Sequence, residues 1–282
     1  MESILSIDVE DWFHISDLDS APSIEEWSSA KTLIEDNFLT LLKIFDRHDI
    51  KTTCFFLGWI AQRFPHLVKE AHKRGHEIAS HGYSHELIYN MSKKEFYQDI
   101  VKSKEILEDI TGEQIFGYRA PSFSITEDTQ WAFDELIRAG YRYDSSVFPL
   151  SRQQGGFKTD KFSPHKIERK KGTIIEFPLT VKETFGFRWS YFGGAYLRLS
   201  PYFLTRYMAK KVLGQGRPVI FYVHPREINP DHPKLAMGFT RHTRTYFGVR
   251  TLKKKLYKII NDFKITTYKK YIKKYSIAEG IP

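Results

Sequence analysis

The sequence predicts an α/β fold built on a mostly parallel sheet that is either open or closed into a barrel. Two observations lead to this class. Short apolar runs typical of β-strands alternate along the chain with segments of helical periodicity. The 282 residues, 41% hydrophobic and 15% aromatic, suffice for a large core and exclude a disordered chain. Because no repeat, low-complexity tract or long Pro/Gly/Ser linker divides the sequence, we expect a single domain over residues 1–282.

Seven apolar runs are expected as strands. In chain order they are ILSIDV (4–9), KTTCFFLG (51–58), HEIAS (76–80), IFGYRAP (115–121), RYDSSVF (142–148), TIIEFPLTV (173–181) and PVIFYVH (218–224). In parallel sheets and barrels, functional side chains gather where strands end and loops begin. We therefore expect polar residues at the ends of these runs to meet on one rim of the sheet.

Helical patterns fill the segments between the runs. Ser92 and Glu95 have the spacing of a capping box at the start of one such segment, and Gly140 follows another where a C-cap glycine is expected. The expected helices cover Thr32 to Arg47, Pro65 to Lys73, Ser92 to Ile110, Glu127 to Ala139 and Pro201 to Leu213.

Charge is distributed unevenly along the chain. From residue 201 onward there are 18 Lys/Arg against 4 Asp/Glu, whereas the first 200 residues hold 25 and 30. This basic third could face an anionic partner such as a membrane surface, a lipid diphosphate or nucleic acid. Lysines interleaved with apolar residues at about 249–275 favour a solvated helix face instead. No nucleic-acid-binding motif is present, so we expect no nucleic-acid partner.

The start of the chain, its apolar stretches and its single cysteine indicate where the protein is located. The start MESILSIDVED lacks a basic region followed by a long apolar segment, and no stretch approaches the roughly 20 apolar residues that span a bilayer. The single cysteine, Cys54, excludes an intrachain disulfide and lies in an apolar run, so core packing is expected. We expect a cytoplasmic protein, peripheral to the membrane if the basic segment contacts lipid.

An acidic cluster follows the first apolar run. Asp8, Glu10 and Asp11 occupy three of four positions, and such carboxylates are costly to bury without a cation. His81 and His85 follow the third run, and their spacing lets both rings approach one metal ion if the segment turns helically. Two imidazoles and one carboxylate are typical of a catalytic site for a divalent metal. Zinc is our first expectation, and cobalt, nickel and iron are also compatible.

Five motifs in order resemble those of the NodB-homology polysaccharide deacetylases, carbohydrate esterase family 4. They are SIDVED, SHGYSH, YRAPSF, YRYDSS and FYVHP, and the segments TCFFLG and GHEIAS resemble framework segments of the same family. The variations resemble the branch associated with exopolysaccharide, capsule and O-antigen loci. The resemblance implies a distorted (β/α)7 barrel.

The same resemblance implies roles for individual residues. Asp8 would be the general base, oriented by Arg119, and His224 the general acid, approaching from the opposite side. Asp144 is the candidate that polarises His224, and Val223 would line the pocket for the substrate methyl. The metal ligands would be His81 and His85. The substrate-binding segment would be Pro121, Ser122 and Phe123.

Two departures from the family pattern leave questions open. Asp8 is followed by Val9 instead of a second aspartate, so the third metal ligand is either Glu10 or Asp11. Strand alternation favours Glu10, provided that the strand continues that far. Ser122 replaces the usual aromatic after the proline, but a backbone N–H there can still face an oxyanion.

Together these features predict a metal-dependent hydrolase that removes N-acetyl groups from amino sugars of a surface polysaccharide or of its lipid- or nucleotide-linked precursor. One alternative is a metal-independent C–N hydrolase of the same fold that acts on a small cyclic amide or ureide. Another is a non-catalytic glycan-binding module.

Overall fold

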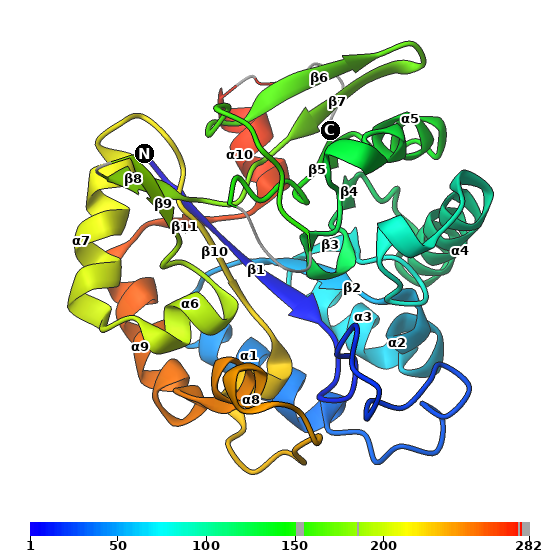
Figure 1. Ribbon diagram of the computed structural model, residues 1–282, viewed down its shortest axis with the longest axis horizontal. Coiled ribbons are helices and arrows are strands. Elements are labelled where there is room, and N and C mark those ends of the chain that lie inside the picture. Colours follow the sequence, from blue (N-terminus) through cyan, green and yellow to red (C-terminus); the bar gives the residue numbers. More distant parts are fainter. Residues whose placement is uncertain (151–154, 185, 276, 278–282) are drawn as a thin grey trace.

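A curled sheet forms the centre of the computed structural model, which describes residues 1–150, 155–184, 186–275 and 277 (Figure 1). Its strand order is β10-β1-β2-β3-β4-β5-β7-β6, and β11 pairs with the start of β1. Seven consecutive strands of this order run parallel, and only β6 is antiparallel to its neighbour. The parallel strands are β1 (Ser3–Val9), β2 (Thr53–Phe56), β3 (Glu77–Ser80), β4 (Gly117–Tyr118), β5 (Tyr143–Asp144), β7 (Gly172–Glu176) and β10 (Ile220–Val223).

The remaining strands lie outside this series. They are β6 (His165–Arg169), β11 (Ile265–Thr266) and a separate hairpin of β8 (Lys182–Thr184) and β9 (Phe187–Trp189). The predicted class of a mostly parallel sheet is therefore confirmed. The expected runs at 115–121, 142–148 and 173–181 are longer than the strands they contain, because pairing stops after two to five residues and the chain then turns into the rim loops.

Helices pack around the sheet (Figure 1). They are α1 (Ile34–Asp46), α2 (Gly58–Arg63), α3 (Pro65–Lys73), α4 (Lys93–Thr111), α5 (Trp131–Arg138), α6 (Gly194–Leu199), α7 (Tyr202–Leu213), α8 (Phe239–Tyr246), α9 (Val249–Asp262) and α10 (Tyr268–Tyr275). The capping box at the start of α4 is confirmed, since Ser92 and Glu95 bond each other's backbone N–H groups. Gly140 follows α5 with a positive φ of 85°, as a C-cap glycine should.

Strand alternation divides the buried side chains into two clusters. Residues such as Leu5, Ile7 and Val223 pack outward against the helices. Residues such as Ile4 and Tyr222, one position away, pack on the inner face with Phe55 and Tyr268. Because successive residues of a strand point to opposite faces, Ser6 and Asp8 share the inner face with Ile4.

The basic segment at 249–275 contains two helices, α9 and α10, separated by β11. Each helix is amphipathic: Leu252, Leu256 and Ile259 of α9 are buried, whereas Lys253 and Lys254 are exposed. The exposed lysines of α9 therefore lie over an apolar, buried face. None of the helices in the described ranges is long and apolar enough to cross a membrane.

Candidate metal and catalytic site

A cavity of about 460 Å³ opens at the carboxyl ends of β1 and β10. Strand ends, the loop after β3, the short 3-10 turns η2 (Pro121–Phe123) and η4 (Pro225–Ile228), and helices α6 and α8 contribute to its wall. The structure thus brings together on one rim residues that are distant in sequence. The predicted site residues that line the cavity are Asp8, Glu10, His81, His85, Ser122, Phe123 and His224.

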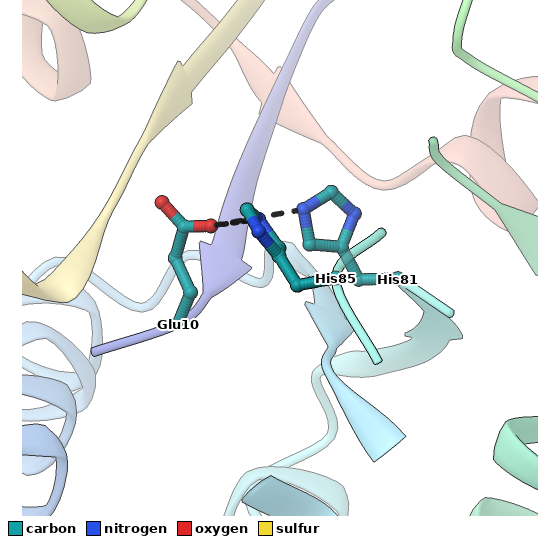
Figure 2. A group of neighbouring side chains, drawn as sticks. All are labelled: Glu10, His81 and His85. Atoms are coloured by element: carbon teal, nitrogen blue, oxygen red, sulfur yellow. Dashed lines mark ion pairs between the residues drawn. The ribbon is translucent and has the colours of Figure 1, made fainter. Parts of the chain in front are cut away.

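One carboxylate and two imidazoles converge at the base of this cavity (Figure 2). Glu10 Oε2 lies 2.5 Å from Nε2 of His85 and 4.0 Å from Nε2 of His81, and all three side chains are buried. His81 Nδ1 hydrogen-bonds the backbone carbonyl of Arg119 at 2.7 Å, which leaves Nε2 available as a ligand atom.

The protonation states of these groups suit a cation. Burial, reinforced by the neighbouring His85, lowers the pKa of His81 to about 4, so that its ring is neutral at neutral pH. Burial raises the pKa of Glu10, but the nearby His85 and His224 outweigh that effect and keep its pKa below the usual value. The neutral ring of His81, the second imidazole of His85 and the ionised carboxylate of Glu10 form a donor set that fits a divalent transition metal such as zinc.

Glu10 reaches the histidines although β1 does not extend to it. The strand ends at Val9, and the N–H of Glu10 donates to the carbonyl of Asp8 at 3.0 Å. The sequence analysis favoured Glu10 on the condition that the strand continues to it, and this condition is not met. A tight turn presents the Glu10 carboxylate instead.

The alternative ligand, Asp11, lies elsewhere. Its carboxylate accepts hydrogen bonds from the Thr32 hydroxyl at 2.5 Å and from the backbone N–H groups of Leu33 and Trp12. These bonds hold it against the start of α1. Between the two carboxylates left open by the sequence, the geometry therefore favours Glu10 as the metal ligand.

The segment from His81 to His85 is a loop, so the expected helical turn is wrong. Gly82 and His85 have positive φ angles of 74° and 55°. Asp99 of α4 fixes this loop by accepting bonds from the N–H groups of Tyr83 (2.7 Å) and Ser84 (2.9 Å) and from the Ser84 hydroxyl. A Cβ at Gly82 would lie 2.8 Å from Asp99 Oδ2, so glycine is required. The sequence reasoning missed Asp99, for which no local pattern gives a signal.

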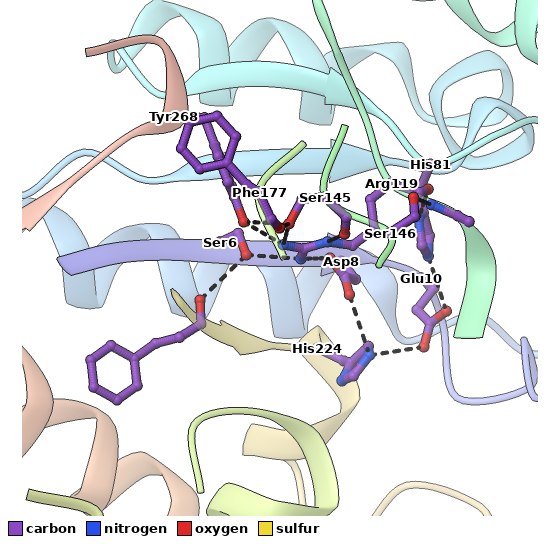
Figure 3. Close-up of polar contacts among 12 residues, drawn as sticks. Ser6, Asp8, Glu10, His81, Arg119, Ser145, Ser146, Phe177, His224 and Tyr268 are labelled. Carbon is purple, nitrogen blue, oxygen red and sulfur yellow. Dashed lines mark hydrogen bonds and ion pairs between the residues drawn. The ribbon is translucent and has the colours of Figure 1, made fainter. Parts of the chain in front are cut away.

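Arg119 lies against Asp8 at the centre of a buried network (Figure 3). Its Nη1 is 2.6 Å from Asp8 Oδ1 and also donates to the Ser6 hydroxyl. Its Nη2 donates to the hydroxyl of Tyr268 at 2.7 Å, and the guanidinium carbon is 4.2 Å from the Phe55 ring centroid. Arg119 is fully buried, so these contacts leave it one orientation in which to hold Asp8.

His224 follows β10 and is held by a carboxylate that the sequence analysis missed. Its Nδ1 is 3.0 Å from Oε2 of Glu227, whose other oxygen is 2.7 Å from Nε of Arg198. Burial lowers the pKa of His224, but the carboxylates of Glu227 and Glu10 outweigh burial and raise it above its usual value. The three-residue spacing of His224 and Glu227, which is that of a capping box, was the available signal.

Glu227 contacts the ring of His224 and has the role that the sequence analysis predicted for Asp144. Asp144 is buried on β5, where it accepts hydrogen bonds from the hydroxyl and N–H of Ser146 and pairs in register with Glu176 of β7. The prediction that Asp144 polarises His224 is therefore wrong, because the side chain belongs to a different buried cluster.

The expected base and acid are neighbours. Asp8 and His224 come from adjacent parallel strands, and Asp8 Oδ2 lies 3.8 Å from Nε2 of His224 (Figure 3). We expected base and acid to approach the substrate from opposite sides, which does not match this arrangement. Strands β1 and β10 are the first and last parallel strands in chain order, and they pair with each other in the sheet.

The predicted substrate-binding residues separate into two groups. Ser122 and Phe123 line the cavity with positive φ angles of 51° and 56°, and the buried Pro121 begins their 3-10 turn. Consecutive left-handed residues are strained, and such strain is concentrated at functional sites. Val223 is fully buried in the outer core and is not among the described residues that line the cavity. Tyr222 lines the cavity instead, because strand alternation places it on the face of His224.

His14 is a further cavity residue to which the sequence analysis gave no role. Its Nδ1 accepts the N–H of Asp11 at 2.8 Å, and its ring centroid is 6.0 Å from that of His85. Its position within SIDVEDWFH, next to the acidic cluster, was the only signal.

Comparison with protein-family models gives two matches. Residues 28–143 match the model described as polysaccharide deacetylase, and residues 145–273 match one described as a domain of unknown function, DUF3473. Among curated proteins, a peptidoglycan deacetylase of Helicobacter pylori is 34% identical over 107 residues, covering 38% of this chain and 36% of that protein. A peptidoglycan-N-acetylglucosamine deacetylase of Bacillus cereus is 35% identical over 97 residues, covering 33% and 35%. The chain thus spans about a third of the length of these relatives.

Solved structures share the fold over nearly the whole chain. A candidate polysaccharide deacetylase from Mycobacterium smegmatis has a TM-score of 0.58 at 18% identity, covering 94% of this chain and 86% of that one. A PuuE allantoinase has a TM-score of 0.63 at 16% identity, covering 98% and 90%. At these identities the similarity concerns the fold alone, and it confirms the expected distorted (β/α)7 barrel.

Proposed function

Because the chain belongs to the NodB-homology polysaccharide deacetylases of carbohydrate esterase family 4, we propose that it is a metal-dependent N-deacetylase of amino sugars. Its substrate in this proposal is a surface polysaccharide or the lipid- or nucleotide-linked precursor of one. A cytoplasmic location and the basic C-terminal third, which could contact an anionic membrane surface, are part of the same proposal.

One observation carries the proposal. The three candidate ligands Glu10, His81 and His85 share a single cavity with two buried pairs, Asp8 with Arg119 and His224 with Glu227. A site that only bound glycan would have no need for a convergent ligand set beside a carboxylate and an imidazole that are each held by a buried, oppositely charged side chain.

The residues divide the chemistry as follows. A divalent ion held by Glu10, His81 and His85 would supply an acidified water and a polarised acetyl carbonyl. Asp8 accepts the proton of the attacking water, and Arg119 keeps its carboxylate oriented. His224, with its raised pKa, donates a proton to the departing amine nitrogen. Ser122 lines the cavity, and its backbone N–H is the candidate donor to the oxyanion.

The metal-independent alternative finds less support. The allantoinase resembles this chain in fold alone, at 16% identity. The three candidate ligand atoms of this chain lie within 4.8 Å of one another, which favours a reaction that uses a cation.

A deacetylation assay with metal analysis tests the proposal. We expect the purified protein to hold about one divalent ion per chain and to release acetate from N-acetylglucosamine glycans, lipid-linked sugars or nucleotide-linked sugars. A chelator should abolish turnover and zinc should restore it. His85→Ala should lose both metal and turnover, whereas His66→Ala, at an exposed histidine outside the cavity, should lose neither.

Two results would overturn the proposal. Undiminished turnover after complete removal of metal would support the metal-independent hydrolase. Absence of product from all three substrate classes in the zinc-loaded protein would support a glycan-binding module.

A further inference from the structure

Four arginines line the cavity besides the candidate catalytic groups. They are Arg198, Arg226, Arg241 and Arg244. Only Arg198 has a carboxylate partner at hydrogen-bond distance, Glu227, within the described part of the chain. The other three therefore add positive charge to the wall formed by η4 and α8.

The carboxylates of the cavity are already committed to other partners. Asp8 is paired with Arg119, and Glu227 with Arg198 and His224. Glu10 contacts His85 at 2.5 Å, and Arg226 Nη2 lies 3.7 Å from its other oxygen. Without a strong anionic partner for the three arginines, the cavity has an excess of positive charge.

Each of the three arginines offers this charge differently. Arg226 Nη1 is buried and has no hydrogen-bond partner among the described residues. Arg241 donates from Nη1 to the backbone carbonyl of Asp17 and from Nη2 to that of Ser16, and neither neutral acceptor cancels its charge. Arg244 is exposed at the cavity wall, where its side chain can reach a ligand.

The helix that carries two of these arginines adds a further positive element. Its N-cap, Gly238, makes no side-chain capping bond, and Gly238 to Arg241 all line the cavity. Uncapped N–H groups at a helix start carry a partial positive charge and bind anions. Helix α8 thus lines the same cavity as His224, which follows β10.

Another part of the cavity wall has a different chemistry. Phe123 and Tyr222 line it with ring centroids 5.1 Å apart, and Tyr196 is nearby in the same lining. Aromatic side chains suit the apolar faces of a sugar ring. The cavity therefore has an aromatic side for the sugar and a basic side for a charged substituent.

We propose that this site is specific for an amino-sugar substrate that carries an anionic group, a phosphate or a carboxylate, bound by Arg226, Arg241, Arg244 and the start of α8. The inference rests on the proposed function, whose substrate class it narrows. Guanidinium groups bind phosphate and carboxylate oxygens in bidentate fashion, which accounts for the choice of arginine over lysine on this wall. The anion could be the diphosphate of a linked precursor or the carboxylate of a neighbouring uronic acid.

Binding measurements on the zinc-loaded protein test this inference separately from turnover. The probes are UDP-N-acetylglucosamine, a hyaluronan tetrasaccharide as the carboxylate source, and neutral tetra-N-acetylchitotetraose. We expect at least one anionic probe to bind about 10-fold more tightly than the neutral one, with an advantage that shrinks as salt rises. The tighter anionic probe identifies the source of the charge.

Two matched variants locate the binding. Arg244→Gln should weaken the anionic probe about 10-fold and the neutral one by less than about 2-fold. Arg250→Gln, at an exposed arginine of α9 outside the cavity, should change neither. Arg241→Gln provides a second variant of the wall.

Equal binding of all probes, no measurable binding, or equal effects of Arg244→Gln and Arg250→Gln would overturn the inference. Selective binding of an anionic probe that is lost in Arg244→Gln would support it even if no acetate were released. In that case the proposed function, and not the anion specificity, would have failed.

Discussion

At the scale of single residues, the site depends on two buried carboxylate pairs with different consequences. Arg119 holds the side chain of Asp8 in place through a direct contact of 2.6 Å. In the second pair the carboxylate acts on its partner. Glu227, which also contacts Arg198, raises the pKa of His224 and so favours its protonated form. Base and acid are therefore prepared by separate arginine-anchored contacts, although their side chains are only 3.8 Å apart.

Glu227→Gln should lower kcat by about 10- to 100-fold with little change in KM, because the amide no longer favours the His224 cation that serves as the acid. Steady-state kinetics on the best substrate would measure both constants. Glu168→Gln, at an exposed position of β6, is the matched control and should leave both unchanged. An unaltered kcat in Glu227→Gln would show that His224 does not depend on this carboxylate.

Sequence reasoning correctly located the site residues that lie at the carboxyl ends of strands, because a residue directly after an apolar run can be recognised from the order of residues alone. Asp8, His81 and His224 meet in the cavity for this reason. It misassigned Asp144, since two carboxylates near strand ends cannot be ranked without knowing which one faces the histidine. Val223 was a different error, because alternation within FYVH already places Tyr222 and not Val223 beside His224.

At the scale of elements, the short and irregular parts escaped prediction. Long helices with clear periodicity, such as α1, α3 and α4, were predicted within a few residues. Helices α2 and α6 have six residues each, too few for a periodic signal. The loop between His81 and His85 was mistaken for a helical turn because its shape is imposed by Asp99, which lies on α4.

Asp99→Asn should weaken metal binding about 10- to 100-fold, because an amide cannot accept all three bonds that hold the loop carrying His85. Competition with a chromogenic chelator would measure the affinity. Asp109→Asn, at an exposed position of the same helix, should bind metal like the parent protein. If the two variants bind metal equally well, the loop does not need Asp99 to present its histidine.

Paired strands also create a pH-sensitive contact between Asp144 of β5 and Glu176 of β7. Burial raises the pKa of both carboxyls, and for Glu176 the neighbouring Asp144 raises it further, well above its usual value of 4.5. An acid with a raised native pKa keeps its proton after the unfolded chain has lost its own. Its contribution to stability is therefore present below about pH 4.5 and is lost as pH rises.

Glu176→Gln should accordingly become more stable relative to the parent protein as pH increases from about 5 to about 8. The parent should lose at most about 1.4 kcal/mol of unfolding free energy per pH unit through this group. Urea unfolding across this range would measure the difference, with Glu168→Gln as the exposed control. A stability difference that is constant with pH would contradict the raised pKa of Glu176 in the folded protein.

At the scale of the whole molecule, the C-terminal segment packs against the first strand and the inner face of the sheet. β11 pairs with the first residues of β1, and α10 packs Tyr268 on the inner face of the barrel. The basic segment therefore has a structural role beneath its charged surface, which charge counting alone could not reveal. The family resemblance predicted the barrel, but not that a tyrosine 149 positions away would contact Arg119.

Tyr268→Phe tests this connection between the two ends of the chain. Loss of the hydroxyl removes the acceptor that lies 2.7 Å from Arg119 Nη2. The buried Nη2 is then left with only its longer contact, 3.3 Å to the hydroxyl of Ser145. We expect a cost of about 1–3 kcal/mol in unfolding free energy and, because Arg119 orients Asp8, a fall in kcat of several-fold. Urea unfolding and kinetics would measure the two effects, and Tyr275→Phe on the same helix provides the comparison. Should both substitutions cost the same stability and spare kcat equally, α10 would only cover the barrel, and the orientation of Arg119 would depend on its strand neighbours alone.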